Sequence, residues 1–163
     1  IKVEEADCAF HARLSCKSKT YMYRIHISDV PNVFERKYVY TYTDSKLDIG
    51  KMREAALALT GTHDFKAFCG NPKMKKSSVR TIYEIAIQER VSEASGQICE
   101  IDISYTGNGF LQNMARILTG TLIEVGNGNM RLSEINKILE SRDRQMAGFT
   151  APPQGLTLMR VEY

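Results

Sequence analysis

Alternating apolar and polar positions predict strands in five stretches of the chain, because successive side chains of a strand point to opposite faces. These stretches are rich in tyrosine, isoleucine and valine, which favour pleated surfaces. They cover residues 20–28, 37–43, 80–90, 97–105 and 155–163. The short stretch 92–96 is suited to join the third and fourth strands as a hairpin.

Apolar positions three and four residues apart predict helices between these strands. Asp48 can cap a helix whose apolar positions run from Ile49 to Leu59, and Ser133 can cap a later one. A long apolar helix is expected over residues 110–125. The resulting order, β-β-α-β-β-α-α-β, predicts an α+β fold with a largely antiparallel sheet and helices packed on one face.

The expected helix over residues 110–125 places an arginine opposite its apolar arc. At about 100° per residue, Arg116 lies beside Asn113 and Gly120, which are not typical of a solvated face. We therefore expect Arg116 to be partly enclosed, and an enclosed guanidinium needs an anion. The anion would be a carboxylate or phosphate outside the segment, or an internal partner such as Asp64 or Asp102.

Two further features of the pattern carry candidate chemistry. The sequence Gly107-Asn108-Gly109 precedes the same expected helix and would expose backbone N–H groups that attract anions. Tyr21 and Tyr23 share one face of their strand, and we expect one of them to pack in the core. The other could stack on a base or take part in proton transfer.

Composition and charge narrow the choice of function class. The chain has 163 residues, enough for one ordinary domain, and a net charge of +3 that permits a nucleic-acid partner without requiring one. Basic residues gather in two runs, one near the start and one in a polar stretch before residue 80. They are Arg13, Lys17, Lys19, Arg24, Lys73, Lys75, Lys76 and Arg80. Each run is either a nucleic-acid contact or a solvated surface.

Cysteine and histidine spacing argues against a metal centre. The four cysteines include no C-x-x-C pair and pair with no histidine at ligand spacing, so we expect reduced thiols in a cytoplasmic protein. No stretch has the roughly 20 apolar residues that a membrane helix needs.

Five segments, in the same order along the whole chain, resemble the TruA family of tRNA pseudouridine synthases. They are Phe10-His11-Ala12-Arg13 with Ser15 and Tyr21-Met22-Tyr23; Gly61-Thr62-His63-Asp64-Phe65 with Phe68; Ser78-Val79-Arg80-Thr81-Ile82; Gly107 to Arg116 with Gly120-Thr121-Leu122; and Asp143-Arg144 with Ala147-Gly148, Thr150-Ala151-Pro152 and Gly155-Leu156.

The resemblance implies an isomerase that converts uridine to pseudouridine in the anticodon stem-loop of tRNA, without cofactor or metal. It implies that Tyr21 stacks on the target uracil, that Arg116 pairs with a catalytic aspartate, and that Leu156 lines the pocket. The basic residues named above, Arg24 excepted, together with Asn108 would then contact RNA. The fold would be one half of the pseudouridine synthase fold, and the enzyme a homodimer.

One motif of that family is absent. The R-T-D-x-G segment that carries the catalytic aspartate occurs nowhere in the 163 residues. In the family it precedes the segment matched at Phe10, so we expect it before Ile1. Residues 1–163 would then be the C-terminal portion of the enzyme, inactive alone. The alternatives are a non-catalytic RNA-binding module and a domain that mediates self-association.

Overall fold

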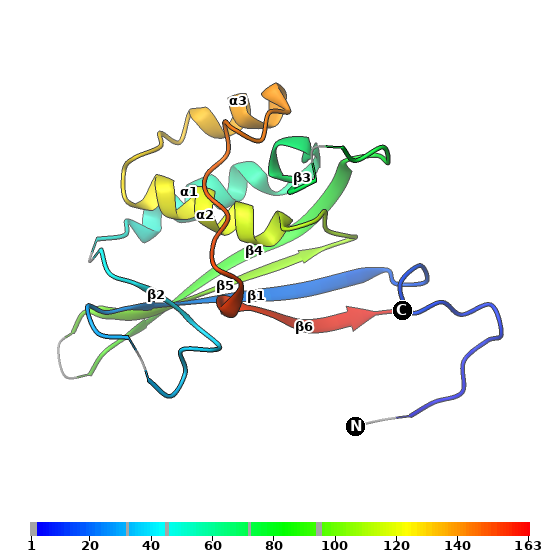
Figure 1. Cartoon of the computed structure of the whole chain (residues 1–163), viewed down its shortest axis with the longest axis horizontal. Helices are drawn as coiled ribbons and strands as arrows, with labels where there is room; N and C mark the ends of the chain where they lie inside the picture. Colours follow the sequence, from blue (N-terminus) through cyan, green and yellow to red (C-terminus); the bar gives the residue numbers. More distant parts are fainter. Residues whose placement is uncertain (1–2, 32, 45, 72, 94–95) are drawn as a thin grey trace.

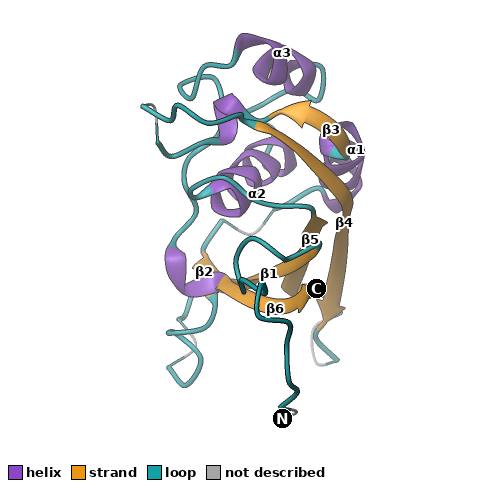
Figure 2. Cartoon of the chain, turned by 90° about the vertical axis from the view of Figure 1, so that its right-hand side faces the viewer, coloured by secondary structure: helices purple, strands orange, loops and turns teal. Residues whose placement is uncertain are grey.

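The computed structural model describes residues 3–31, 33–44, 46–71, 73–93 and 96–163. A six-stranded sheet forms its base, and the helices lie to one side of it (Figures 1 and 2). The strands are β1 Ser18–Ile27, β2 Tyr40–Tyr42, β3 Gly61–Asp64, β4 Val79–Val91, β5 Ile98–Gly107 and β6 Leu156–Glu162. The helices are α1 Ile49–Leu59, α2 Met114–Gly126 and α3 Glu134–Ser141, with short 3-10 turns η1 Lys66–Phe68 and η2 Pro153–Gly155.

The sheet has the order β2-β1-β5-β4-β3, and β6 also pairs with β1. Every pairing is antiparallel except that of β1 with β2. The far edge of β1 is shared, because β6 pairs with its first half and β2 with its last three residues. The fold is therefore the expected α+β arrangement, with a largely antiparallel sheet and helices on one face.

The core lies between the sheet and helices α1 and α2. Alternate residues of β5, Ile101, Ile103 and Tyr105, are fully buried on the helix side. The opposite side of the same strands carries charge: Arg90 pairs with Glu100 at 2.9 Å, and Arg24 lies 3.6 Å from Asp102. Burying one face while solvating the other fixes the strand register, since a slip of one residue would exchange the two faces.

Helix α1 begins where the sequence predicted. Asp48 accepts a hydrogen bond from the Lys51 N–H at 3.0 Å, which satisfies a free donor of the first turn. Helix α3 differs, because Ser133 makes no side-chain cap. Instead, the Glu134 carboxylate accepts from the Arg131 N–H at 2.7 Å.

Helix α2 begins at Met114, so the expected start at residue 110 is wrong. Asn113 adopts a left-handed backbone conformation with φ of 58°, which interrupts the helical path just before Met114. Gly107-Asn108-Gly109 consequently lies at the end of β5 and not at a helix N-terminus. The expectation that these residues lie at a helix N-terminus is therefore wrong.

Two strands also differ from the sequence prediction: one is shorter than expected and one was not expected. The stretch 37–43 contributes only β2, because Tyr38 and Val39 both donate backbone hydrogen bonds to the Glu35 carbonyl in a turn. Strand β3, at Gly61–Asp64, was not predicted, since its four residues show too little alternation to be recognised. The expected hairpin joins β4 to β5 through Ser92 and Gln97, and residues 94–95 within it lie outside the described residues.

The segment 142–155 covers the side of α2 that faces away from the sheet. Figure 1 shows it, in orange to red, crossing α2 on its way from α3 to β6. Gly120 of α2 is packed so closely that an added Cβ would lie 1.9 Å from the Phe149 carbonyl oxygen. Helix α2 is thus enclosed on both sides, and that is why Arg116 is partly buried.

Replacing Gly120 with alanine should lower the free energy of unfolding by about 1–3 kcal/mol, because the methyl group has no space beside Phe149. Urea denaturation measures this. Gly109→Ala is the control, since its nearest neighbours would be 3.6 Å away. Equal stability of the two variants would contradict the close packing of the segment 142–155 on α2.

Candidate active-site wall

Tyr21 and Tyr23 occupy the same face of β1 but have different environments. Tyr23 is fully buried, its hydroxyl donates to the Pro152 carbonyl at 2.7 Å, and burial raises its pKa above the usual value. Tyr21 is half-buried, and its ring meets Phe110 edge to face with ring centroids 5.1 Å apart. The expectation that one of the pair is a core residue is confirmed, and that residue is Tyr23.

Arg116 is held by neutral oxygen atoms. Its Nε donates to the Ala151 carbonyl at 2.6 Å, and its Nη1 donates to the Asn113 side-chain carbonyl at 3.1 Å. Among residues 3–31, 33–44, 46–71, 73–93 and 96–163, it forms no ion pair. Its Nη2 therefore remains available to a further acceptor.

The two internal ion pairs considered for Arg116 do not form. Asp64 pairs with Arg142 at 2.9 Å and accepts a hydrogen bond from the Ser78 hydroxyl. Asp102 pairs with Arg90 and Arg24 on the opposite face of the sheet. Both carboxylates are thus committed to other arginines, and neither neutralises Arg116.

Tyr21, Arg116 and Leu156 line one small hollow of about 130 Å³. They come from β1, α2 and the first residue of β6, which are brought together by the β1–β6 pairing and by the segment 142–155. The hollow is completed by Phe110, Leu111, Asn113, Met114 and Ala115. An apolar floor, one phenol and one partly unpaired guanidinium can hold a flat polar ring and an anion beside it.

A basic groove of about 380 Å³ adjoins this hollow, and Phe110 lines both. Four of the residues predicted to bind RNA meet in it: Arg13, Lys19, Arg80 and Asn108. Arg80 donates to the Ser77 and Val79 carbonyls, and the Asn108 side chain accepts from the Thr81 N–H at 3.0 Å. These bonds hold both side chains at the groove.

The sequence around Arg13 folds into a compact turn. The Leu14 and Ser15 N–H groups donate to the His11 carbonyl, and the Arg13 N–H donates to His11 Nδ1 at 3.2 Å. The Ser15 hydroxyl accepts from the His11 N–H at 3.0 Å. His11 and Ser15 therefore shape the backbone that carries Arg13 to the groove.

The remaining predicted RNA contacts lie elsewhere. Lys75 and Lys76 line a separate hollow of about 340 Å³ together with Arg142, and Lys73 is exposed in the same loop. Lys17 donates to the Tyr163 carbonyl at 3.0 Å and does not line the groove. The predicted basic residues thus fall into one group that lines the groove and others that do not, although Val79 lines both the groove and the hollow of Lys75 and Lys76.

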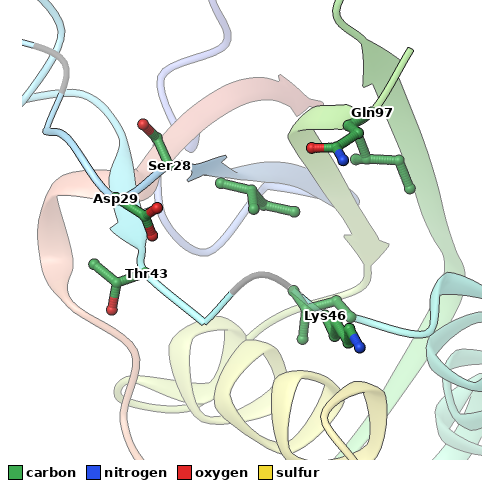
Figure 3. A pocket seen from close by; sticks show the side chains of 8 residues that line it. Ser28, Asp29, Thr43, Lys46 and Gln97 are labelled. Carbon is green, nitrogen blue, oxygen red and sulfur yellow. The ribbon is translucent and has the colours of Figure 1, made fainter. Parts of the chain in front are cut away.

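A further hollow, of about 400 Å³, lies near the last residues of β1. Figure 3 shows Ser28, Asp29 and Thr43 on one side of it and Lys46 and Gln97 across from them. None of the residues predicted from the sequence to act in a site lines this hollow. Its polar groups are therefore not part of the candidate site.

The described residues contain neither a metal-binding cluster nor a membrane-spanning helix. In that part of the chain, no group of three or more histidine, cysteine, aspartate or glutamate side chains is arranged to hold a metal ion. No helix in the same ranges has both the length and the apolar character to cross a membrane.

Comparison with known proteins shows the family of the chain. The family model described as tRNA pseudouridine synthase matches residues 55–163. The chain belongs to the tRNA pseudouridine synthase family. Its match to tRNA pseudouridine synthase A of Geobacillus sp. (strain WCH70) is 43% identical over 163 residues, 99% of this chain and 62% of the relative. The corresponding protein of Bacillus subtilis (strain 168) is 43% identical over 162 residues and is also covered to 62%.

The family assignment extends over nearly all of the candidate site. Arg116, Arg80, Asn108 and Leu156 lie inside the matched range, and Tyr21 and Arg13 lie inside the longer alignments with the relatives. The chain spans about three fifths of the length of these tRNA pseudouridine synthases.

Sequence reasoning missed two members of the site region. Phe110 falls inside the helix predicted over residues 110–125, yet it lies before α2 and lines both the hollow and the groove. Arg144 was noted only as part of a motif, yet it bonds the segment that covers α2. The left-handed Asn113 and the tertiary contacts of Arg144 leave no periodic signal in the sequence.

The two tyrosines should respond differently to loss of the hydroxyl group. Tyr23→Phe should lower the free energy of unfolding by about 1–3 kcal/mol, because a buried hydrogen bond to Pro152 is lost. Tyr21→Phe should change it by less than about 0.5 kcal/mol, since in the described structure its hydroxyl makes no hydrogen bond. Denaturant titration of both variants measures this. An equal decrease in the free energy of unfolding of the two variants would refute the assignment of Tyr23 to the core.

Proposed function

We propose that this chain is the C-terminal portion of a tRNA pseudouridine synthase and forms one wall of its active site. The observation that carries the proposal is the meeting of Tyr21, Arg116 and Leu156 in one hollow. That hollow is smaller than the roughly 300–1,000 Å³ of most ligand pockets, as expected of a partial site. The reaction is the isomerisation of uridine to pseudouridine in the anticodon stem-loop, without cofactor or metal.

The reaction breaks the N1–C1′ bond of uridine and joins C5 to C1′, so a proton leaves C5 and N1 ends protonated. Tyr21 would stack on the extruded uracil, and its hydroxyl would be the group that takes the C5 proton. Stacking also offsets part of the few kcal/mol that extrusion of a base costs. Leu156 would exclude water from one side of the ring.

Arg116 would orient the catalytic aspartate, which we place in the residues before Ile1. Support comes from the bonding of its guanidinium: neutral carbonyl oxygen atoms hold Nε and Nη1, and Nη2 is left for a carboxylate. Two fixed bonds set the plane of the guanidinium, so an incoming carboxylate meets donors that are already oriented.

The groove of Arg13, Lys19, Arg80 and Asn108 would hold the RNA backbone beside the extruded base. Lys17, Lys73, Lys75 and Lys76 would contact more distant phosphates. We further propose that the enzyme acts as a homodimer in the cytoplasm. If the residues before Ile1 contain no R-T-D-x-G segment, the chain is instead an RNA-binding or self-association module of the same scaffold.

The longer protein should lose turnover when Arg116 is changed. Arg116→Lys should reduce kcat by roughly 10²-fold, because lysine cannot keep both the Ala151 and Asn113 bonds while pairing with a carboxylate. The KM for tRNA should change little. Release of tritium from tRNA labelled at C5 of uridine measures both constants, because the C5 hydrogen leaves in the reaction.

Arg160→Ala is the control for that experiment, because Arg160 is exposed and, among the described residues, forms an ion pair only with Glu162. Normal turnover with a large increase in KM for Arg116→Lys would assign Arg116 to RNA binding. Pseudouridine formation by residues 1–163 alone, abolished by changing one of their own aspartates, would overturn the proposal that the catalytic aspartate precedes Ile1.

Removing the groove charges should weaken the salt dependence of tRNA binding. The triple variant Arg13→Ala, Lys19→Ala, Arg80→Ala should reduce the slope of log K against log salt concentration by about 2–3, since each phosphate contact contributes nearly 1. The matched control changes Lys51, Arg131 and Lys137, three exposed cations outside the groove. Equal slopes for the two triple variants would exclude the groove as an RNA site.

A further inference from the structure

Arg144 is partly buried, and uncharged atoms accept its hydrogen bonds. Its Nη1 donates to the Gly148 carbonyl at 2.9 Å and more weakly to the Ala147 carbonyl at 3.3 Å, and its Nη2 donates to the Thr150 hydroxyl at 2.9 Å. Burial lowers the pKa of Arg144 below its usual value. Within the described residues it has no carboxylate partner, so its charge is used to bind three sites of a single turn, residues 147–150.

That turn is packed directly against the backbone of α2. The Gly148 N–H donates to the Thr121 hydroxyl at 3.0 Å, and a Cβ on Gly148 would lie 2.6 Å from the Thr121 backbone. The Phe149 carbonyl oxygen also packs closely against Gly120, since a Cβ on Gly120 would lie 1.9 Å from it. The turn therefore has one position on the helix, and the three hydrogen bonds of Arg144 hold it there.

The residue that follows the turn holds Arg116. The Ala151 N–H donates to the Arg116 carbonyl at 3.1 Å, and the Ala151 carbonyl accepts from Arg116 Nε at 2.6 Å. Thr150, which Arg144 binds, is the immediate neighbour of Ala151. A shift of the turn would therefore move the acceptor that sets the direction of the Arg116 guanidinium.

We propose that Arg144 is a positioning residue for Arg116: it fixes the turn 147–150, and through Ala151 the turn fixes the guanidinium in the candidate site. The inference rests on the proposed function, since it concerns the same site. Arg144 acts through another residue and does not contact substrate. Its planar fork suits this task, because it reaches two carbonyls and a hydroxyl at once, which an ammonium group cannot do with the same geometry.

The test measures solvent exchange of the Arg116 Nε–H by ¹⁵N NMR in residues 1–163. In Arg144→Ala the exchange should be faster by roughly tenfold or more, the factor expected when a hydrogen bond of a charged group is lost. The Ala151 amide should accelerate with it, and the amides of β4 and β5 should keep their rates. Arg160→Ala, the control, should leave Arg116 unchanged.

Two milder variants keep the proposal testable if Arg144→Ala fails to fold. Thr150→Val preserves shape and removes one acceptor, so Arg116 Nε–H exchange should rise by roughly threefold. Arg144→Lys should give an Arg116 Nε–H exchange rate between those of the wild type and Arg144→Ala. Wild-type exchange of Arg116 in all folded variants, or a uniform acceleration that includes β4 and β5, would overturn the proposal.

Turnover in the longer protein gives an independent result. Arg144→Lys should lower kcat while the KM for tRNA stays within about twofold, as a positioning role requires. A raised KM with unchanged kcat would show that Arg144 binds RNA and would overturn the inference. If the longer protein forms no pseudouridine, the proposed function fails, and Arg116 exchange still decides the positioning claim.

Discussion

The pair of hydrogen bonds between Arg116 and Ala151 ties the candidate site to the rest of the fold. One bond joins the two backbones, and the other turns the Arg116 guanidinium toward the segment 142–155. Because Ala151 lies between the turn at Gly148 and the buried contact of Pro152 with Tyr23, the position of Arg116 depends on contacts at both ends of that segment. The hydrogen bonds that hold the segment 142–155 against the core therefore also set the position of Arg116.

This constraint explains the small residues along the contact between α2 and the segment. Gly120 and Gly148 face backbone atoms at distances that exclude a methyl group. Gly155 lies equally close to the Tyr23 ring, where an added Cβ would be 2.7 Å away. Close approach of two backbones gives Arg116 a rigid acceptor, and rigid support is what an oriented catalytic group needs.

The sequence predicted the parts of the structure that depend on periodicity. The antiparallel strands, the Asp48 cap and the enclosure of Arg116 all followed from spacing and residue type. The start of α2 did not, because the left-handed Asn113 lies inside an apolar stripe that continues to Phe110. Of the two alternatives for the partner of Arg116, the internal ion pair is wrong, since Asp64 and Asp102 are engaged by other arginines. The roles proposed for Tyr21, Arg116 and Leu156 come from the resemblance to a family, because periodicity carries no information on chemistry.

The central claim is that Tyr21, Arg116 and Leu156 form one wall of a pocket completed by a carboxylate from outside residues 1–163. A crystal structure of the longer protein tests this most directly. The account predicts a carboxylate oxygen from the residues before Ile1 within about 4 Å of the Arg116 Nη atoms. A longer protein in which Arg116 pairs with one of this chain's own carboxylates, with Tyr21 covered by unrelated structure, would contradict it.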